Sequence, residues 1–319
     1  MPSFFKKIII YLCYYTGLNF LFGYFGKNKL YVLNFHSIYS EANKEELLVK
    51  AYPNLSMPLD QFEARIKYLI QHGHTFIKSK DLASIESKKL RKPTILYFDD
   101  GFKDNLVNAL PILKKYNIPA IIFISTSLIN RQSILWTIKY RLFLFSQGRS
   151  DQDIALEIKR FKKQSFSDSQ IELENIYQQN NFKINLEHLN IFLSWLDIQE
   201  LIKNGIEIGS HGLNHDNLLH LSEEHLRQEL MESKRIIESK ISQPVIAFSF
   251  PYGRYNERVL RFAKECGYKL IVSAGSGLND IASLNSEIFL LKNIPVRIQD
   301  SFLAFKVNLY SANIARGKK

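Results

Sequence analysis

Two short motifs in this 319-residue chain bring together side chains that could carry out hydrolytic chemistry. The first is Phe98-Asp99-Asp100-Gly101, which follows an apolar run at residues 94–98. Two adjacent buried carboxylates are costly without partners. A cation between them, or a division into a base and a metal ligand, would remove that cost. An exposed Asp-Asp-Gly turn is the common alternative for this motif taken alone.

The second motif is H-G-L-N-H at residues 211–215. Histidines four residues apart, here His211 and His215, fall on one face of a helical turn and suit two ligands of one metal. Ser210 could orient such a site, although two unrelated loop histidines are the alternative interpretation. Together with an aspartate, the two rings give three protein ligands, which is typical of a hydrolytic metal site with open positions for water. The remaining aspartate could take a proton from that water.

The elements that must position these motifs alternate between strand and helix. Strands are predicted at 31–35, 94–98, 120–124, 206–208, 245–248, 270–273 and 289–296, and helices at 59–70, 106–116, 195–204, 223–239 and 257–265. Repeated strand–helix units imply a parallel sheet or a β/α barrel. Polar motifs follow four of the strands, and the carboxyl ends of the strands carry the chemistry in such barrels. The pattern therefore predicts one site built from several loops.

Residues 127–190 interrupt this alternation. The segment is polar and rich in Gln, Lys and Glu, and its apolar residues recur at helical spacing. We therefore predict a helical insertion at about 127–190.

The first 29 residues form a distinct apolar and basic segment. Residues 8–25 are mostly apolar, but polar residues and glycines dilute them, and Lys6, Lys7, Lys27 and Lys29 flank them. A spanning helix needs about 20 strongly apolar residues, and no small-residue cleavage site follows this segment. A helix lying on a membrane surface and a helix packed on the domain are the two interpretations. We expect a cytoplasmic or inner-membrane-associated protein.

The composition excludes few partners. Hydrophobic residues make up 46% of the chain, enough for a core, and Cys13 and Cys266 are too few for a disulfide framework. The net charge of +11 would suit an anionic glycan, a membrane surface or nucleic acid, and a Lys-rich genome would explain it equally well. We expect no nucleic-acid partner, because no nucleic-acid-binding motif is present. The oligomeric state stays open.

In combination and in this order, the motifs resemble the polysaccharide deacetylase family, the NodB homology domain of carbohydrate esterase family 4. Residues 97–101 match its first motif, 211–215 its second, and Pro251-Tyr252 the end of its third. The flanks at 33–38, 192–195, 207–211 and 248–253 are similar to the branch found in surface-polysaccharide clusters. The resemblance covers roughly residues 30–297.

The resemblance implies a fold and a metal site. It implies an α/β domain over residues 30–312, built as a distorted (β/α)7-type barrel with the helical insertion. It also implies that Asp100, His211 and His215 hold one divalent metal. Zinc is the expected ion, with nickel, cobalt and manganese as alternatives.

The resemblance further assigns roles in catalysis. Asp99 would be the general base, and His36 the general acid of this branch. The backbone N–H of Tyr252, next to Pro251, would help form the oxyanion hole. The implied reaction removes the acetyl group from an N-acetylated sugar of a bacterial polysaccharide or lipid-linked saccharide.

Two departures from the family pattern leave alternatives open. Gly212 replaces the usual Ser or Thr, and Ser249 stands where many members have an Arg that orients the base. A glycan-binding protein with a decayed site is therefore one alternative, and a hydrolase of another acyl or C–N bond is a second. The histidines outside the motifs are expected to have surface or packing roles: His72, His74, His188, His220 and His225.

Overall fold

The computed structural model describes residues 15–16, 29–43, 52, 55–84, 90–162, 166–186, 189–275, 277–281, 284, 288–298 and 300–311. The predicted N-terminal segment 1–29 lies outside this part of the chain except at positions 15, 16 and 29. None of the helices in the described ranges is long and apolar enough to cross a membrane.

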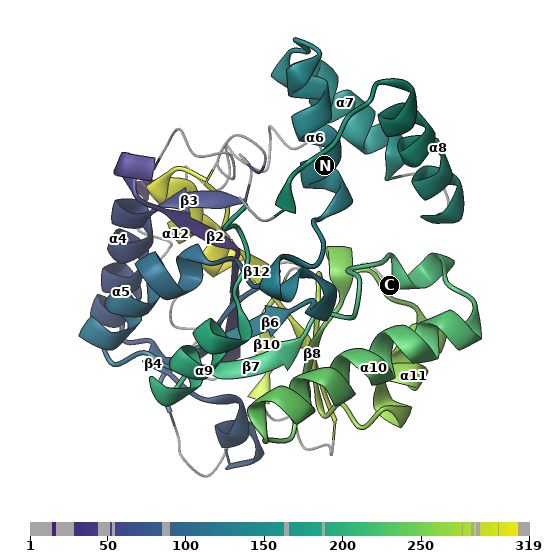
Figure 1. Cartoon of the computed structure of the whole chain (residues 1–319). Helices are drawn as coiled ribbons and strands as arrows, with labels where there is room; N and C mark the ends of the chain where they lie inside the picture. The colour runs from purple at the N-terminus through teal and green to yellow at the C-terminus, as the bar shows by residue number, and fades with distance from the viewer. Residues whose placement is uncertain are drawn as a thin grey trace.

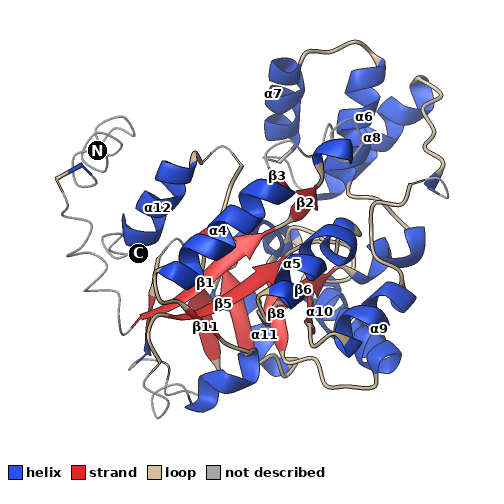
Figure 2. Ribbon diagram, turned by 90° about the vertical axis from the view of Figure 1, so that its left-hand side faces the viewer, coloured by secondary structure: helices blue, strands red, loops and turns tan. Residues whose placement is uncertain are grey.

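A mostly parallel sheet of ten strands forms the centre of the described residues (Figure 1; Figure 2). Its main path runs in the order β10 (Asn279–Asp280), β1 (Lys29–Phe35), β5 (Pro93–Phe98), β6 (Ile121–Ile124), β7 (Glu207–Ser210), β8 (Ala247–Ser249), β9 (Leu270–Ser273) and β11 (Phe289–Lys292). β4 (Thr75–Phe76) pairs with β5, and only β10 runs antiparallel to its neighbour. A separate parallel pair joins β2 (Ser37–Tyr39) to β3 (Ser56–Pro58).

The two ends of this sheet are linked by one stretch of chain. β11 pairs with β9, whereas β12 (Ile294–Pro295) pairs with β1. Asn293 lies between them, so the predicted single strand at 289–296 is broken there into two short strands, one paired at each end of the sheet. Seven strand positions thus surround a nearly closed barrel, in agreement with the predicted fold class.

Most helices cover the outside of the sheet (Figure 2). They are α4 (Leu59–Gln71), α5 (Leu110–Lys115), α9 (Trp195–Lys203), α10 (Glu223–Ile241), α11 (Glu257–Glu265) and α12 (Phe302–Ser311). One turn of π-helix at Asn105–Ala109 leads into α5. A capping box begins α9, because the Ser194 hydroxyl accepts the Asp197 N–H and the Asp197 carboxylate accepts the Ser194 N–H.

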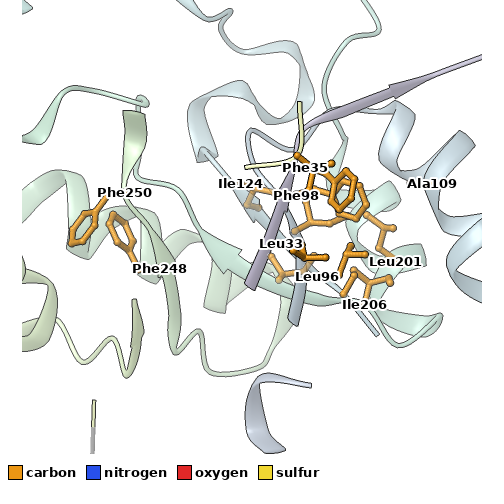
Figure 3. Close-up of a cluster of buried hydrophobic side chains, with 14 of the residues drawn as sticks. Leu33, Phe35, Leu96, Phe98, Ala109, Ile124, Leu201, Ile206, Phe248 and Phe250 are labelled. Atoms are coloured by element: carbon orange, nitrogen blue, oxygen red, sulfur yellow. The ribbon is translucent and has the colours of Figure 1, made fainter. Parts of the chain in front are cut away.

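Alternate residues of the strands pack into two hydrophobic clusters. In β1, Leu33 and Phe35 join an outer cluster beneath the helices, and Leu96 and Phe98 of β5 join them there (Figure 3). The residues between them, such as Val32, belong to an inner cluster that fills the barrel. This alternation follows from the two-residue period of a strand, and it decides which side chains point into the barrel.

Three helices follow β6 and stand apart from the barrel (Figure 1). They are α6 (Trp136–Ser146), α7 (Asp151–Phe161) and α8 (Phe166–Gln179). They pack on one another through a cluster of their own, which includes Tyr140, Phe143, Ile154, Phe161 and Leu173. Among the described residues between β6 and β7, none belongs to a strand of the sheet. We call α6, α7 and α8 the helical subdomain.

Candidate active site

A pocket of about 430 Å³ lies at the carboxyl ends of the barrel strands. Val32 and Tyr97 belong to the inner cluster, so the next residues of that alternation, Asn34 and Asp99, also face the interior. Both line the pocket, at the ends of β1 and β5. The barrel interior is thus apolar below and polar where the strands end.

Asp100, His211 and His215 come together at this pocket. Asp100 Oδ1 lies 3.2 Å from His215 Nε2 and 3.5 Å from His211 Nε2. All three residues are buried, and their potential ligand atoms lie within 4.8 Å of one another. Asp100 Oδ1 and His215 Nδ1 have no hydrogen-bond partner within the described part of the chain. A buried carboxylate oxygen without a partner, facing two imidazole nitrogens, fits a divalent cation.

His211 is held in the orientation that a metal ligand needs. Its Nδ1 donates to the backbone oxygen of Ser249 at 2.8 Å, which leaves the Nε2 lone pair facing Asp100. Burial lowers the pKa of His211 to about 3, so the ring is neutral at neutral pH. A neutral imidazole with a free Nε2 is the form that binds a metal.

Local backbone conformation brings these groups together. Asp100, His215 and Tyr252 have φ angles of 74°, 61° and 58°, in the left-handed region that non-glycine residues rarely adopt. Such residues cost about 1–3 kcal/mol each and cluster at functional sites. The predicted helical turn at 211–215 is therefore wrong. The segment is a loop whose reversal at His215 places the two imidazole centroids 4.9 Å apart.

Asp99 lies beside this cluster in a different environment. Asn34 Nδ2 donates to Asp99 Oδ2 at 2.6 Å, and His211 Nδ1 lies 3.8 Å from Asp99 Oδ1. Burial, and after it the charge of Asp100, raises the pKa of Asp99, while contacts with Ser249 and Asn34 oppose that rise. A carboxyl group with a raised pKa is suited to accept a proton near neutral pH.

The other predicted residues fall in two groups. His36 and Tyr252 line the pocket, and burial is the largest of the effects that lower the pKa of His36. Pro251 and Ser210 are buried but are not among the lining residues. Ser210 Oγ accepts the N–H of Gly212 at 3.2 Å and so contacts the loop between the two histidines.

Several pocket residues were not predicted. Trp136 of the helical subdomain donates from Nε1 to the Tyr252 hydroxyl at 3.0 Å, and Lys162 lines the same wall. Tyr52 donates to Asp100 Oδ2 at 3.3 Å, and His220 lies at the exposed rim. An Asn in an otherwise apolar strand, as at Asn34, was a signal that sequence reasoning could have used. The composition of the helical subdomain gave no such signal.

Comparison with known proteins identifies the family. A model of the polysaccharide deacetylase family matches residues 86–271, which is more than half of the chain. The chain belongs to the polysaccharide deacetylase family. It is accordingly a hydrolase of carbon–nitrogen bonds, of a kind that uses a metal, and the cluster of Asp100, His211 and His215 could hold one.

Similar proteins agree with this assignment. YxkH of Bacillus subtilis, whose name classes it provisionally as a polysaccharide deacetylase, is 26% identical over 84% of this chain and 71% of its own length. The poly-beta-1,6-N-acetyl-D-glucosamine N-deacetylase of Staphylococcus aureus is 25% identical over 76% of this chain and 71% of its own. The solved structure of Streptococcus pyogenes deacetylase PplD superposes with a TM-score of 0.59 at 21% identity, over 90% of this chain and 98% of that one. That last likeness concerns the fold.

Proposed function

We propose that this deacetylase hydrolyses the acetamide of an N-acetylated sugar in a bacterial polysaccharide or lipid-linked saccharide. The products would be a free amino sugar and acetate. The observation that carries the proposal is the buried carboxyl group of Asp99 beside the Asp100–His211–His215 cluster in one pocket. The Staphylococcus aureus relative, named for the removal of acetyl groups from poly-N-acetylglucosamine, supports the same bond type.

Asp100, His211 and His215 would hold one divalent metal through Oδ1 and the two Nε2 atoms. When bound, the metal supplies Lewis-acid polarisation of a carbonyl group and a lowered pKa for water. Zinc is the first choice, because it accepts mixed nitrogen and oxygen ligands and its catalytic sites have three protein ligands. Nickel, cobalt and manganese stay alternatives.

The remaining steps belong to side chains and one backbone group of the chain. Asp99 would accept a proton from the attacking water as the new C–O bond forms. The N–H of Tyr252, a residue whose positive φ turns the backbone at the pocket, would stabilise the oxyanion. His36 would donate a proton to the nitrogen as the C–N bond breaks. The charge of Asp100 favours the protonated ring that this step needs and opposes the effect of burial on the pKa of His36. Amide and water are thereby converted to amine and acetic acid, which become ammonium and acetate at neutral pH. The proton that Asp99 accepts balances the proton that His36 donates.

A panel of free and lipid-linked N-acetyl-hexosamine saccharides tests this proposal. The full chain, supplied with zinc, should reduce the mass of at least one saccharide by one acetyl group and release an equal amount of acetate. Release of formate, or of acetate without a new amine, would indicate the alternative hydrolase of another acyl or C–N bond. Binding of saccharides without any product would favour the decayed glycan-binding protein.

We also propose that residues 1–29 place the enzyme at a membrane surface, and that residues 127–190 form an insertion in a domain spanning 30–312. The apolar run at 8–25 and its flanking lysines support the first proposal, because each basic residue near an anionic leaflet contributes about 1 kcal/mol. Fractionation of the full chain against a chain starting at Leu30 tests it. Equal recovery of both in the soluble fraction at low salt would contradict it.

A further inference from the structure

Three basic side chains line the pocket from three separate segments. Lys162 follows α7, Arg254 follows the Pro251-Tyr252-Gly253 turn, and Arg297 follows β12. All three are exposed at the mouth. Within the described ranges, none of them is in an ion pair. Among the described residues, positive charge therefore gathers at this opening without an ion-paired carboxylate.

The acidic residues of the pocket offset the charge of these three basic residues only in part, through Asp100 acting on Lys162. The two carboxylates among the lining residues are Asp99 and Asp100, at the strand ends. Asp100 belongs to the candidate metal cluster, where a divalent cation would more than offset its charge. Lys162 and Arg254 are also close enough to repel each other electrostatically. Like charges that line one cleft raise the local concentration of an oppositely charged ligand.

The helical subdomain fixes one of these charges over the candidate active site. Trp136 Nε1 donates to the Tyr252 hydroxyl, and Lys162 Nζ lies 5.5 Å from the centroid of the same Tyr252 ring. That ring in turn lies 4.7 Å from the ring of His215. The ammonium group is thus two side-chain contacts from the candidate metal cluster. Because the ammonium group lies so close to the candidate metal cluster, an anionic group that it binds would lie on the sugar that carries the acetamide or on the next sugar.

A neutral substrate could accept hydrogen bonds from these three side chains but would not offset their charge. Neutral sugars are bound by hydrogen bonds and by stacking on aromatic rings, and the amine formed from a neutral glycan would be repelled by three cations. An anionic group on the saccharide would pair with the rim before and after hydrolysis. Resting on the proposed function, we propose that the substrate is a saccharide carrying a negatively charged group, phosphate or carboxylate, which Lys162, Arg254 and Arg297 bind.

Three matched probes test this inference. They are an N-acetylglucosamine disaccharide, the same disaccharide with a phosphate ester, and a disaccharide of N-acetylglucosamine and a uronic acid. Binding is measured by calorimetry on the full-length Asp99→Asn protein with zinc, so that affinity is read without turnover. Acetate release is measured in parallel on the wild-type chain.

We expect at least one charged probe to bind about tenfold or more tightly than the neutral one, because hydrogen bonds to a charged group are stronger than those between neutral groups. If only the phosphate probe binds more tightly than the neutral one, the site recognises phosphate. If both charged probes do, the site recognises negative charge of either kind. The ratio of the affinity for that charged probe to the affinity for the neutral probe should fall about tenfold or more when Lys162→Gln, Arg254→Gln and Arg297→Gln are combined. Lys159→Gln, an exposed lysine of α7 away from the pocket, is the matched control and should keep the ratio.

The outcomes separate this inference from the proposed function. Equal binding of all three probes, with acetate still released, would contradict the proposal of an anionic substrate and would leave the proposed deacetylation standing. Preferential binding of a charged probe without acetate release supports the anionic subsite and contradicts the proposed reaction. Should the triple variant fail to show a wild-type circular dichroism spectrum, the three single variants carry the same comparison, each with a smaller expected fall.

Discussion

A Cβ at residue 212 would lie 2.8 Å from Glu229 Oε1, so the carboxylate of Glu229 in α10 occupies space that only a glycine at 212 leaves open. Gly212 also has a φ of +88°, which disfavours any side chain there. The same Glu229 carboxylate accepts the N–H of Asn214 at 2.7 Å and its side-chain amide at 3.1 Å. The glycine that departs from the family pattern therefore makes room for a buried carboxylate that holds the loop between His211 and His215.

Glu229→Ala should weaken metal binding without removing a ligand. The substitution removes the acceptor of the Asn214 N–H and so loosens the loop between the two histidines. We expect the zinc dissociation constant to rise about tenfold, within the range seen when supporting groups of metal sites are removed. Zinc affinity is measured by competition with a chelator. Glu224→Ala, at an exposed position of the same helix, is the control, and an unchanged affinity in the Glu229 variant would contradict this role.

Alanine at Asp100, His211 or His215 should reduce zinc content to background. Each substitution removes one of three protein ligands, and a site left with two holds the ion poorly. Metal content of the purified proteins is measured by mass spectrometry. His220→Ala, which changes a rim histidine outside the cluster, should retain the wild-type content. Full retention in all three cluster variants would refute the metal site.

Asn34 is expected to position Asp99. Its Nδ2 donates to Asp99 Oδ2 and to the Tyr97 hydroxyl, both at 2.6 Å, and Asn293 Nδ2 donates to the same hydroxyl at 2.5 Å. This network lies on the side of the pocket that holds Asp99, the proposed base.

Asn34→Ala should therefore lower kcat about 10–100-fold, because the base loses the group that orients it, with little change in KM or zinc content. Tyr97→Phe leaves the Asn34–Asp99 bond in place and should lower kcat less. A fall confined to KM, or loss of zinc in the Asn34 variant, would point to a general structural role instead.

His74 should make the fold sensitive to mild acid, away from the active site. It is buried, its Nδ1 lies 2.8 Å from Thr94 Oγ1, and burial lowers its pKa to about 3. The unfolded chain, with an ordinary pKa of about 6.5, binds the proton first as pH falls. The free energy of unfolding should therefore decline between about pH 6.5 and 3, by up to about 1.4 kcal/mol per pH unit.

Urea unfolding of wild type and His74→Gln at several pH values measures this contribution. The variant should show the shallower decline, and His225→Gln, at an exposed position of α10, should follow the wild type. Parallel declines in wild type and His74→Gln would show that this histidine does not carry the effect.

Much of the fold follows from local signals in the sequence. The predicted bounds of α11 agree with the structure because Asn256 caps its start and the chain turns at Gly267 soon after its end. The break at Asn293 was missed because it depends on strand pairing with β9 and β1, which residue preferences do not encode. The helical turn at 211–215 was predicted wrongly, because spacing alone does not reveal the reversal at His215.

The candidate site was predicted only in part, for a similar reason. Motifs at strand ends indicate which residues share the carboxyl edge of a barrel, so the clustering of Asp100, His211 and His215 could be anticipated. The bond between Trp136 and Tyr252 joins residues 116 positions apart and depends on how the helical subdomain packs. Such contacts depend on tertiary structure, and no local sequence pattern predicts them.

Asp99→Asn tests the central claim of a metal-assisted deacetylation most directly. The amide keeps the shape of the side chain but cannot accept the proton from water. Wild type and variant, both loaded with zinc to equal content, are compared for acetate release from the saccharide that wild type deacetylates in the panel. We predict full zinc content in the variant and a rate about 10²–10⁴-fold below that of wild type. A variant that keeps its zinc and releases acetate at the wild-type rate at neutral pH would contradict this account.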